Sequence, residues 1–173
     1  MSKTTVKFAI LTIALVLIQV LGLNHICLWG VAMAFAYIYV LIHLPLTLSQ
    51  NWVLTIGFFL GLTVDVFSDT AGMCSLSCTV LAAVRKPVLR LYMPREEELT
   101  DPCPGTHSLG SAVFMKYSLT LCLIYCTLIF IIESFSFFSP LRLALRILSS
   151  TVLTWLVVLA IDTIISKSNE KRL

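Results

Sequence analysis

The sequence predicts an all-α integral membrane protein with six transmembrane helices. Of its 173 residues, 58% are hydrophobic and 12% are charged, whereas about a quarter of a soluble domain is charged. Six apolar runs alternate with polar breaks, and most basic residues lie at every second break or near the ends of the chain. At about 20 residues per span, the length leaves no room for a sizeable soluble domain. We therefore expect one membrane domain over residues 1–173, and the net charge of +3 is too small to indicate nucleic-acid binding.

The first two spans are predicted at residues 8–23 and 27–44. Lys3 and Lys7 precede the first run, so this segment resembles a secretory signal peptide. The Ala-Met-Ala triplet at 32–34 even mimics a cleavage site. Because that triplet lies inside the second apolar run, a signal peptidase could not readily reach it. We expect an uncleaved first helix and a short turn around Asn24.

The third and fourth spans are predicted at residues 52–67 and 71–84. Their apolar cores hold only 13 and 14 residues, or about 20 Å of helix at 1.5 Å per residue. The hydrocarbon core is about 30 Å thick. Either the helices extend into flanking polar residues or they form a tight, partly re-entrant hairpin. We expect a short hairpin.

Residues 85–111 form the one long loop, followed by predicted spans at 112–132 and 143–165. The loop opens with Arg85, Lys86 and Arg90 among apolar residues. This spacing is typical of a helix that lies on the membrane surface with its basic side toward lipid headgroups. These three residues are therefore our candidate membrane-surface contacts.

The distribution of basic residues predicts the orientation. With six crossings and the N-terminus inside, ten basic residues lie inside and two outside, which matches the positive-inside rule. If the third and fourth runs made one crossing, eight of the twelve would lie outside. A re-entrant hairpin that does not cross the membrane would leave every other segment on the same side. This alternative is therefore also allowed by the charges. Both termini and the long loop are thus predicted to be cytoplasmic. The ten inside residues are Lys3, Lys7, Arg85, Lys86, Arg90, Arg95, Lys116, Lys167, Lys171 and Arg172, and the two outside are Arg142 and Arg146.

The most unusual stretch is 57–73, which reads G-F-F-L-G-L-T-V-D-V-F-S-D-T-A-G-M. Gly57 and Gly61 are four residues apart, a spacing that lets another helix approach closely, in this chain or in another. A carboxylate such as Asp65 costs a few kcal/mol within a membrane and usually faces protein. Asp65 is either a functional or partner contact or a polar helix end, with Ser68 and Asp69 making the turn.

A second candidate cluster is Glu133 with Arg142 and Arg146 at the outer side of the last two spans. The two arginines are four residues apart, so they share a helix face. The cluster either contacts a partner or consists of interfacial charges satisfied by water and lipid headgroups.

Enzymatic and metal chemistry are not expected. Cys74 with Cys78 and Cys122 with Cys126 are each four residues apart, but four thiolates within hydrocarbon would be costly without a metal, and no acid or histidine supports them. The remaining cysteines, Cys27 and Cys103, are predicted on opposite sides of the membrane, so we expect no disulfide.

The acidic residues also argue against catalysis. Asp65 and Asp162 are predicted at different depths, which does not suit an intramembrane aspartyl protease. The sequence holds neither H-E-x-x-H nor G-x-S-x-G. We therefore expect no catalytic residues and no cofactor.

Three segments resemble the MreD family of bacterial rod-shape-determining membrane proteins, in its Bacteroidetes-type branch. The stretch 57–73 resembles the family signature at Gly57, Gly61, Asp65, Ser68 and Gly72. The segments R-K-P-V-L-R-L-Y-M-P-R at 85–95 and F-I-I-E-S-F-S-F at 130–137, containing Glu133, follow in order. That branch often carries a histidine pair where this chain has Tyr125 and Cys126, so any role of those histidines does not transfer.

The resemblance implies a non-catalytic subunit of the cell-elongation machinery for peptidoglycan synthesis. MreC would be the direct partner, and MreB, RodA and a class B penicillin-binding transpeptidase would be indirect ones, within the inner membrane and its lipids. It also implies the fold of substrate-binding subunits of energy-coupling-factor transporters, with six helices and cytoplasmic termini. The partner or packing residues would be Gly57, Gly61, Asp65, Asp69, Gly72, Glu133, Arg142 and Arg146. A vitamin or small-molecule transporter subunit is the alternative.

Overall fold

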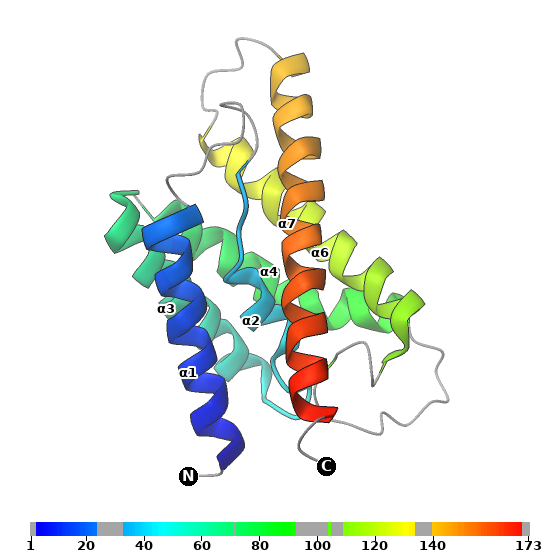
Figure 1. Ribbon diagram of the computed structural model, residues 1–173. Helices are drawn as coiled ribbons and strands as arrows, with labels where there is room; N and C mark the ends of the chain where they lie inside the picture. The colour runs from blue at the N-terminus through cyan, green and yellow to red at the C-terminus, as the bar shows by residue number, and fades with distance from the viewer. Residues whose placement is uncertain are drawn as a thin grey trace.

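The computed structural model describes residues 3–23, 33–70, 72–92, 104, 109–133 and 140–170. All regular structure in those ranges is helical (Figure 1). The helices are α1 (Lys3–Ile18), which continues into a π-helical turn, η1 (Gln19–Leu23), then α2 (Ile38–His43), α3 (Gln50–Ser68), α4 (Met73–Tyr92), α6 (Ser111–Glu133) and α7 (Pro140–Glu170).

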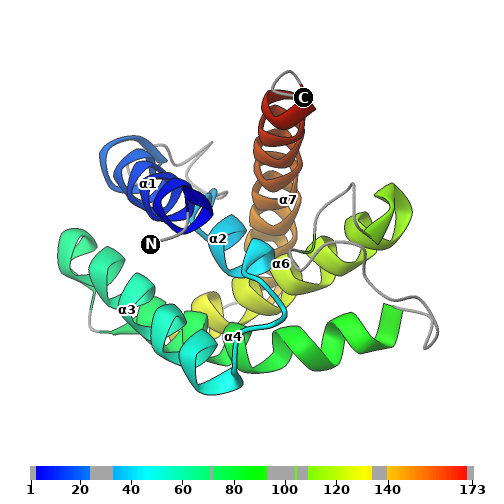
Figure 2. The same ribbon diagram turned by 90° about the horizontal axis from the view of Figure 1, so that it is seen from below.

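The helices surround the short helix α2. α3 packs most extensively against α4, α4 against α6, and α6 against α7. α2 contacts α4, α6 and α7, and it lies between α1 and α7 in both views (Figures 1 and 2). The first turn of α1 and the last turn of α7 lie at the same end of the molecule (Figure 1).

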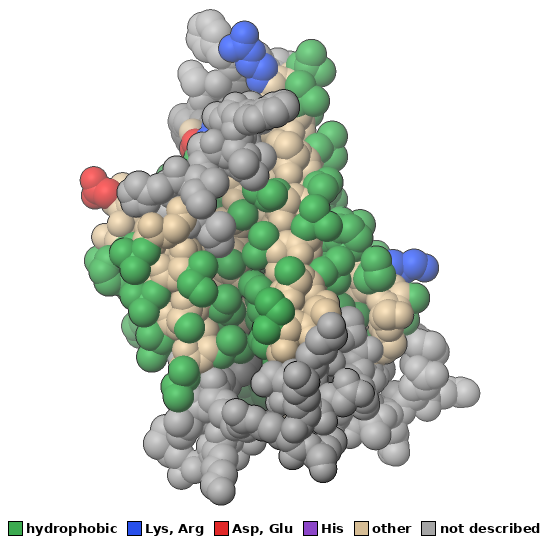
Figure 3. Space-filling model, viewed as in Figure 1, with side chains coloured by type: hydrophobic (Ala, Val, Ile, Leu, Met, Phe, Trp, Pro, Cys, Tyr) green, Lys and Arg blue, Asp and Glu red, His purple; other side chains and the backbone are tan. Residues whose placement is uncertain are grey.

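Three of the described helices are long and apolar enough to cross a membrane. They are α3, α6 and residues Leu141–Ile165 of α7, and a shorter apolar stretch, Ile10–Gly22, lies in α1 and η1. Large hydrophobic side chains on these helices are exposed, including Phe59, Leu123 and Val152. Hydrophobic side chains cover much of the described surface in Figure 3, with charged ones at its margins. This all-helical, apolar surface is compatible with a membrane protein.

The predicted second span is not a continuous helix. Residues 33–35 have no regular secondary structure, a turn follows at 36–37, and α2 holds only six residues. Residues 27–32 of this span lie outside the described ranges. Segment 33–45 is nevertheless buried almost throughout, with Ile38 and Val40 fully inaccessible. Irregular backbone inside an apolar interior must find hydrogen-bond partners in the surrounding protein. Side chains of other helices supply them.

α4 does not end where the sequence predicted. The helix continues past Val84 to Tyr92, so Arg85, Lys86 and Arg90 belong to α4 and not to a loop. Pro87 lies inside the helix and cannot donate the usual hydrogen bond to the carbonyl of Ala83. The Gln50 side-chain amide donates to the carbonyls of Ala82, at 3.0 Å, and Ala83, at 3.5 Å. A neighbouring helix thus supplies the donor that the proline lacks.

α3 and α4 form the predicted hairpin, but neither helix is short. They hold 19 and 20 residues, about 30 Å each at 1.5 Å per residue. Both extend into flanking polar residues, one of the two possibilities that the sequence left open.

Candidate functional site

Asp65 lies buried at the end of α3, where its carboxylate caps the start of α4. Its side chain is 3% exposed. The backbone N–H groups of Cys74 and Ser75 donate to its two oxygens at 2.9 and 2.8 Å, and the Thr70 hydroxyl donates at 2.5 Å. The first N–H groups of a helix have no partner within it, and the helix dipole favours a negative charge there. Asp65 therefore joins α3 to α4.

The turn between the two helices depends on two residues with positive φ. Asp69, at φ 52°, ends α3 in the left-handed conformation and donates its N–H to the carbonyl of Asp65. The N–H of Thr70 donates to the same carbonyl at 3.1 Å. Gly72 has φ 80°, where a side chain would be strained. Asp69 is exposed, so its role in this turn comes from its backbone.

Gly57 and Gly61 let α3 approach α4 within this chain. A Cβ atom on Gly61 would lie 2.4 Å from the Cα of Ser75 and 2.6 Å from the carbonyl oxygen of Cys74. A Cβ on Gly57 would lie 3.1 Å from the Ala82 side chain and from the Cys78 carbonyl. The two glycines therefore form an internal contact, and Gly61 is the tighter of the two.

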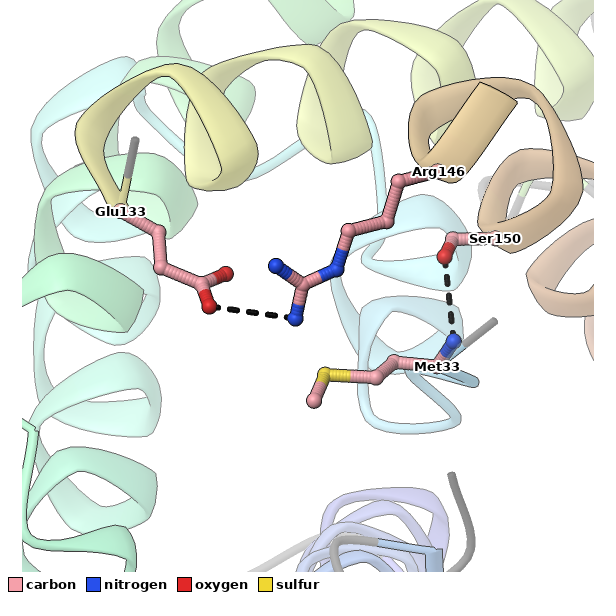
Figure 4. A network of polar contacts seen from close by, with 4 residues as sticks. All are labelled: Met33, Glu133, Arg146 and Ser150. Carbon is pink, nitrogen blue, oxygen red and sulfur yellow. Dashed lines mark hydrogen bonds and ion pairs between the residues drawn. The ribbon is translucent and has the colours of Figure 1, made fainter. Parts of the chain in front are cut away.

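Glu133 and Arg146 pair, whereas Arg142 does not join them. The guanidinium of Arg146 reaches from α7 to the Glu133 carboxylate at 3.1 Å (Figure 4). It also lies over the Phe130 ring, 4.8 Å from its centroid. Both partners of the pair are about a third exposed. Arg142 is exposed, and among the described residues nothing pairs with it.

The sequence did not predict the polar contacts that hold residues 33–36. The Gln19 side chain, in η1, donates to the carbonyl of Ala34 at 3.0 Å and accepts the N–H of Ala36 at 2.9 Å. From α7, Ser150 accepts the N–H of Met33 at 3.0 Å, one turn from Arg146 (Figure 4). Thr154 accepts the N–H of Phe35 at 3.3 Å. Side chains thus take the place of the missing helical hydrogen bonds.

Arg85 holds the other end of this segment and corrects the membrane-surface prediction. Its side chain is 1% exposed, and its guanidinium donates to the carbonyls of Leu41, Leu44 and Pro45 at 3.0, 2.5 and 3.3 Å. These carbonyls at the end of α2 lack helical partners, and a cation suits a helix C-terminus.

Lys86 and Arg90 differ from Arg85. The Lys86 ammonium donates to the carbonyl of Leu48 at 2.9 Å and is half-buried, whereas Arg90 is exposed. Of the three predicted surface residues, only Arg90 is exposed.

Tyrosines and Asp162 extend the polar interior. The hydroxyls of Tyr37 and Tyr125 contact each other, and the Tyr39 hydroxyl donates to Asp162 at 3.2 Å. Along α7, Arg146, Ser150, Thr154 and Asp162 are spaced by multiples of four residues, which places them on one ridge of the helix. This ridge faces the irregular segment.

The described residues hold no arrangement that resembles a metal or thiol centre. Cys74, Cys78, Cys122 and Cys126 are free and buried, and no three metal-binding side chains gather among the residues with defined placement. Cys27 and Cys103 lie outside the described ranges. The two buried acids, Asp65 and Asp162, bind different parts of the fold.

Comparisons with known proteins do not identify a relative. No protein-family model matches the chain, and no curated protein and no solved structure has significant similarity to it.

Proposed function

We propose that the chain is a non-catalytic membrane subunit of the bacterial cell-elongation complex, in the manner of MreD, and that it binds MreC. The observation that carries the proposal is the hairpin at residues 57–75. The three segments that resemble MreD include this stretch, and its unusual residues act in packing. The Asp65 carboxylate accepts three hydrogen bonds, so its role is to fix the hairpin.

The proposal includes six membrane crossings in the inner membrane, with both termini in the cytoplasm. The bias of basic residues, ten against two, supports this topology. The antiparallel course of α3 and α4 and the common end of α1 and α7 are compatible with it. The Glu133–Arg146 pair and the turn at Asp69 would then face the outer side, where a partner could reach them.

The proposal is tested by affinity purification from native membranes in a mild detergent, followed by identification of the retained proteins. We expect MreC and a penicillin-binding transpeptidase. The Asp65→Ala variant should insert but retain less MreC and impair rod morphogenesis, because the hairpin is loosened. Normal cell shape and undiminished retention of MreC in that variant would contradict the proposal that the complex depends on Asp65.

A substrate-binding subunit of a vitamin or small-molecule transporter is the second candidate. The interrupted second span favours it, because broken helices commonly build transporter sites. Much of the polar backbone of segment 33–45, however, already bonds with Gln19, Arg85, Ser150 and Thr154. A tightly bound vitamin and a co-purified pair of cytoplasmic ATPases would favour this candidate over the first.

A further inference from the structure

Three carbonyl oxygens converge at the end of α2. The oxygens of Leu41, Leu44 and Pro45 all lie within hydrogen-bonding distance of the Arg85 guanidinium. The chain leaves the helical conformation at Leu44, where φ is −57° and ψ is 138°. In a continuing helix the carbonyl of Leu41 would receive the N–H of residue 45, but that residue is proline and has no N–H. The end of α2 therefore needs a donor from outside the helix.

This arrangement has the properties of a cation-binding site. Carbonyl oxygens at a helix C-terminus carry partial negative charge, and in transporters the ends of broken membrane helices bind cations through such oxygens. Leu41 and Leu44 are only 1% and 2% exposed, so water competes little for their carbonyls. We name the oxygens of Leu41, Leu44 and Pro45 the carbonyl site.

The occupant of the carbonyl site comes from α4. Arg85 is 1% exposed, and its two terminal nitrogens divide the site between them. Nη1 donates to the carbonyl of Leu41 at 3.0 Å, and Nη2 donates to those of Leu44 at 2.5 Å and Pro45 at 3.3 Å. A buried charge is costly unless hydrogen bonds compensate for the lost water. The carbonyl site supplies this compensation, so it holds the guanidinium as it would hold a ligand.

The division of the site between two nitrogens selects the chemistry of the occupant. A guanidinium is planar and presents its donors as a rigid fork, so it can serve three oxygens from two separate atoms. Lys86, the next residue, shows the contrast, because its ammonium is a compact charge and donates to the carbonyl of Leu48 at 2.9 Å. The carbonyl site therefore fits a guanidinium group better than a spherical ion.

We propose that the carbonyl site binds a guanidinium-type cation, which the wild-type chain supplies as its own Arg85, and that it accepts a free alkylguanidinium when that side chain is shortened. The site depends only on contacts within this chain, so it stands independently of the proposed function. It also bears on the transporter alternative, because a coupling ion cannot enter the carbonyl site while Arg85 occupies it.

Chemical complementation of Arg85→Ala tests the proposal. N-Ethylguanidinium supplies the atoms that this substitution removes, and it is added to the purified variant in detergent while thermal unfolding is followed. We expect saturable binding in the millimolar range, because the untethered cation loses its freedom of motion on binding. The unfolding midpoint should rise by about 3–6 °C when the cation is at about ten times its dissociation constant. N-Ethylurea, which has a similar shape but no charge, should raise it by less than about 1 °C.

Three controls locate the effect at the carbonyl site. The wild type should not respond to N-ethylguanidinium, because its site is filled. Arg90→Ala should not respond either, because this substitution removes an exposed guanidinium of the same helix. Na⁺ and K⁺ at the same ionic strength should shift the midpoint of Arg85→Ala by less than about 1 °C. An equal response in either control protein, or an equal effect of N-ethylurea or of an alkali cation on Arg85→Ala, would overturn the proposal.

The yield of folded protein gives a second measurement if Arg85→Ala does not fold unaided. The variant is then made by cell-free synthesis into lipid nanodiscs, with N-ethylguanidinium or N-ethylurea present during folding. We expect a several-fold higher yield of monodisperse protein with the cation than with the neutral compound. Equal yields would overturn the proposal, as would a purified variant whose midpoint does not change with N-ethylguanidinium.

Discussion

Two regions of this protein satisfy buried backbone in different ways. In the hairpin, Asp65 bonds with Thr70, Cys74 and Ser75, all within ten residues of it along the chain. In the interrupted segment, the partners of Met33 and Phe35 lie 117 and 119 residues away. In both regions, side chains bond with backbone groups that would otherwise lack partners in an apolar interior. The first does so locally, and the second depends on the assembled bundle.

The two regions also differ in how closely their backbones pack. In the hairpin, the Asp65 carboxylate caps α4, and Gly57 and Gly61 have no side chains to hold α3 away from α4. The interrupted segment has few small residues, and its backbone forms hydrogen bonds with the side chains of Gln19, Arg85, Ser150 and Thr154. Substitutions in the two regions should therefore act through different physical causes.

The largest effect is expected from Gly61→Ala. The new methyl group would lie 2.4 Å from the Cα of Ser75, so the helices must move apart, at a cost of more than about 3 kcal/mol in the free energy of unfolding. Gly57→Ala is the matched control, with nearest contacts of 3.1 Å and an expected loss of about 1 kcal/mol or less. Both substitutions replace glycine by alanine within a helix, so the gain in helix propensity is the same for the two variants. Equal losses, measured by thermal unfolding in detergent, would show that the glycine contact is not what closes the hairpin.

Within the interrupted segment, the largest effect is expected from Arg85→Met. The substitution keeps an apolar stem but leaves the carbonyls of Leu41, Leu44 and Pro45 without their donor, which should cost about 2–3 kcal/mol. Arg90→Met, at an exposed position of the same helix, should cost less than about 0.5 kcal/mol. The two variants are compared by the same unfolding measurement. A surface role for Arg85 would make their effects alike.

The smallest effect is expected from Thr154→Val. It removes the acceptor of the Phe35 N–H and should lower the free energy of unfolding by about 1 kcal/mol. Thr163→Val is the control on the same helix, because the Thr163 hydroxyl bonds only with the Leu159 carbonyl one turn back and is exposed. Its cost should stay within about 0.5 kcal/mol. If both variants match the wild type, α7 does not hold the interrupted segment through this bond.

The sequence predicted the hairpin because its determinants are local. The spacing of Gly57 and Gly61 indicates a close helix contact, and Asp65 precedes a turn that Asp69 and Gly72 can form. The sequence could not show that the glycines face α4 or that the carboxylate reaches Cys74 and Ser75. Those contacts depend on how the turn brings the second helix back.

The sequence did not predict the break in the second span, since nothing in the run itself marks residues 33–37. The signal lies elsewhere, in Gln19, Ser150 and Thr154, which are polar residues inside other apolar runs. Their partners cannot be known before the bundle is assembled. Arg85 was misplaced for the same reason, because its carbonyl partners lie 40 to 44 residues earlier in the chain.

The central claim is that Asp65 is a structural cap that joins α3 to α4. Asp65→Ala and Asp69→Gly test it most directly, because the two acids are four residues apart and only Asp65 uses its carboxylate inside the fold. The measurement is the free energy of unfolding in detergent. Asp65→Ala should lose about 3 kcal/mol, since two buried N–H groups are left without an acceptor. Asp69→Gly should stay within about 0.5 kcal/mol of the wild type, because glycine accepts the positive φ. A fully stable Asp65→Ala protein would contradict the claim.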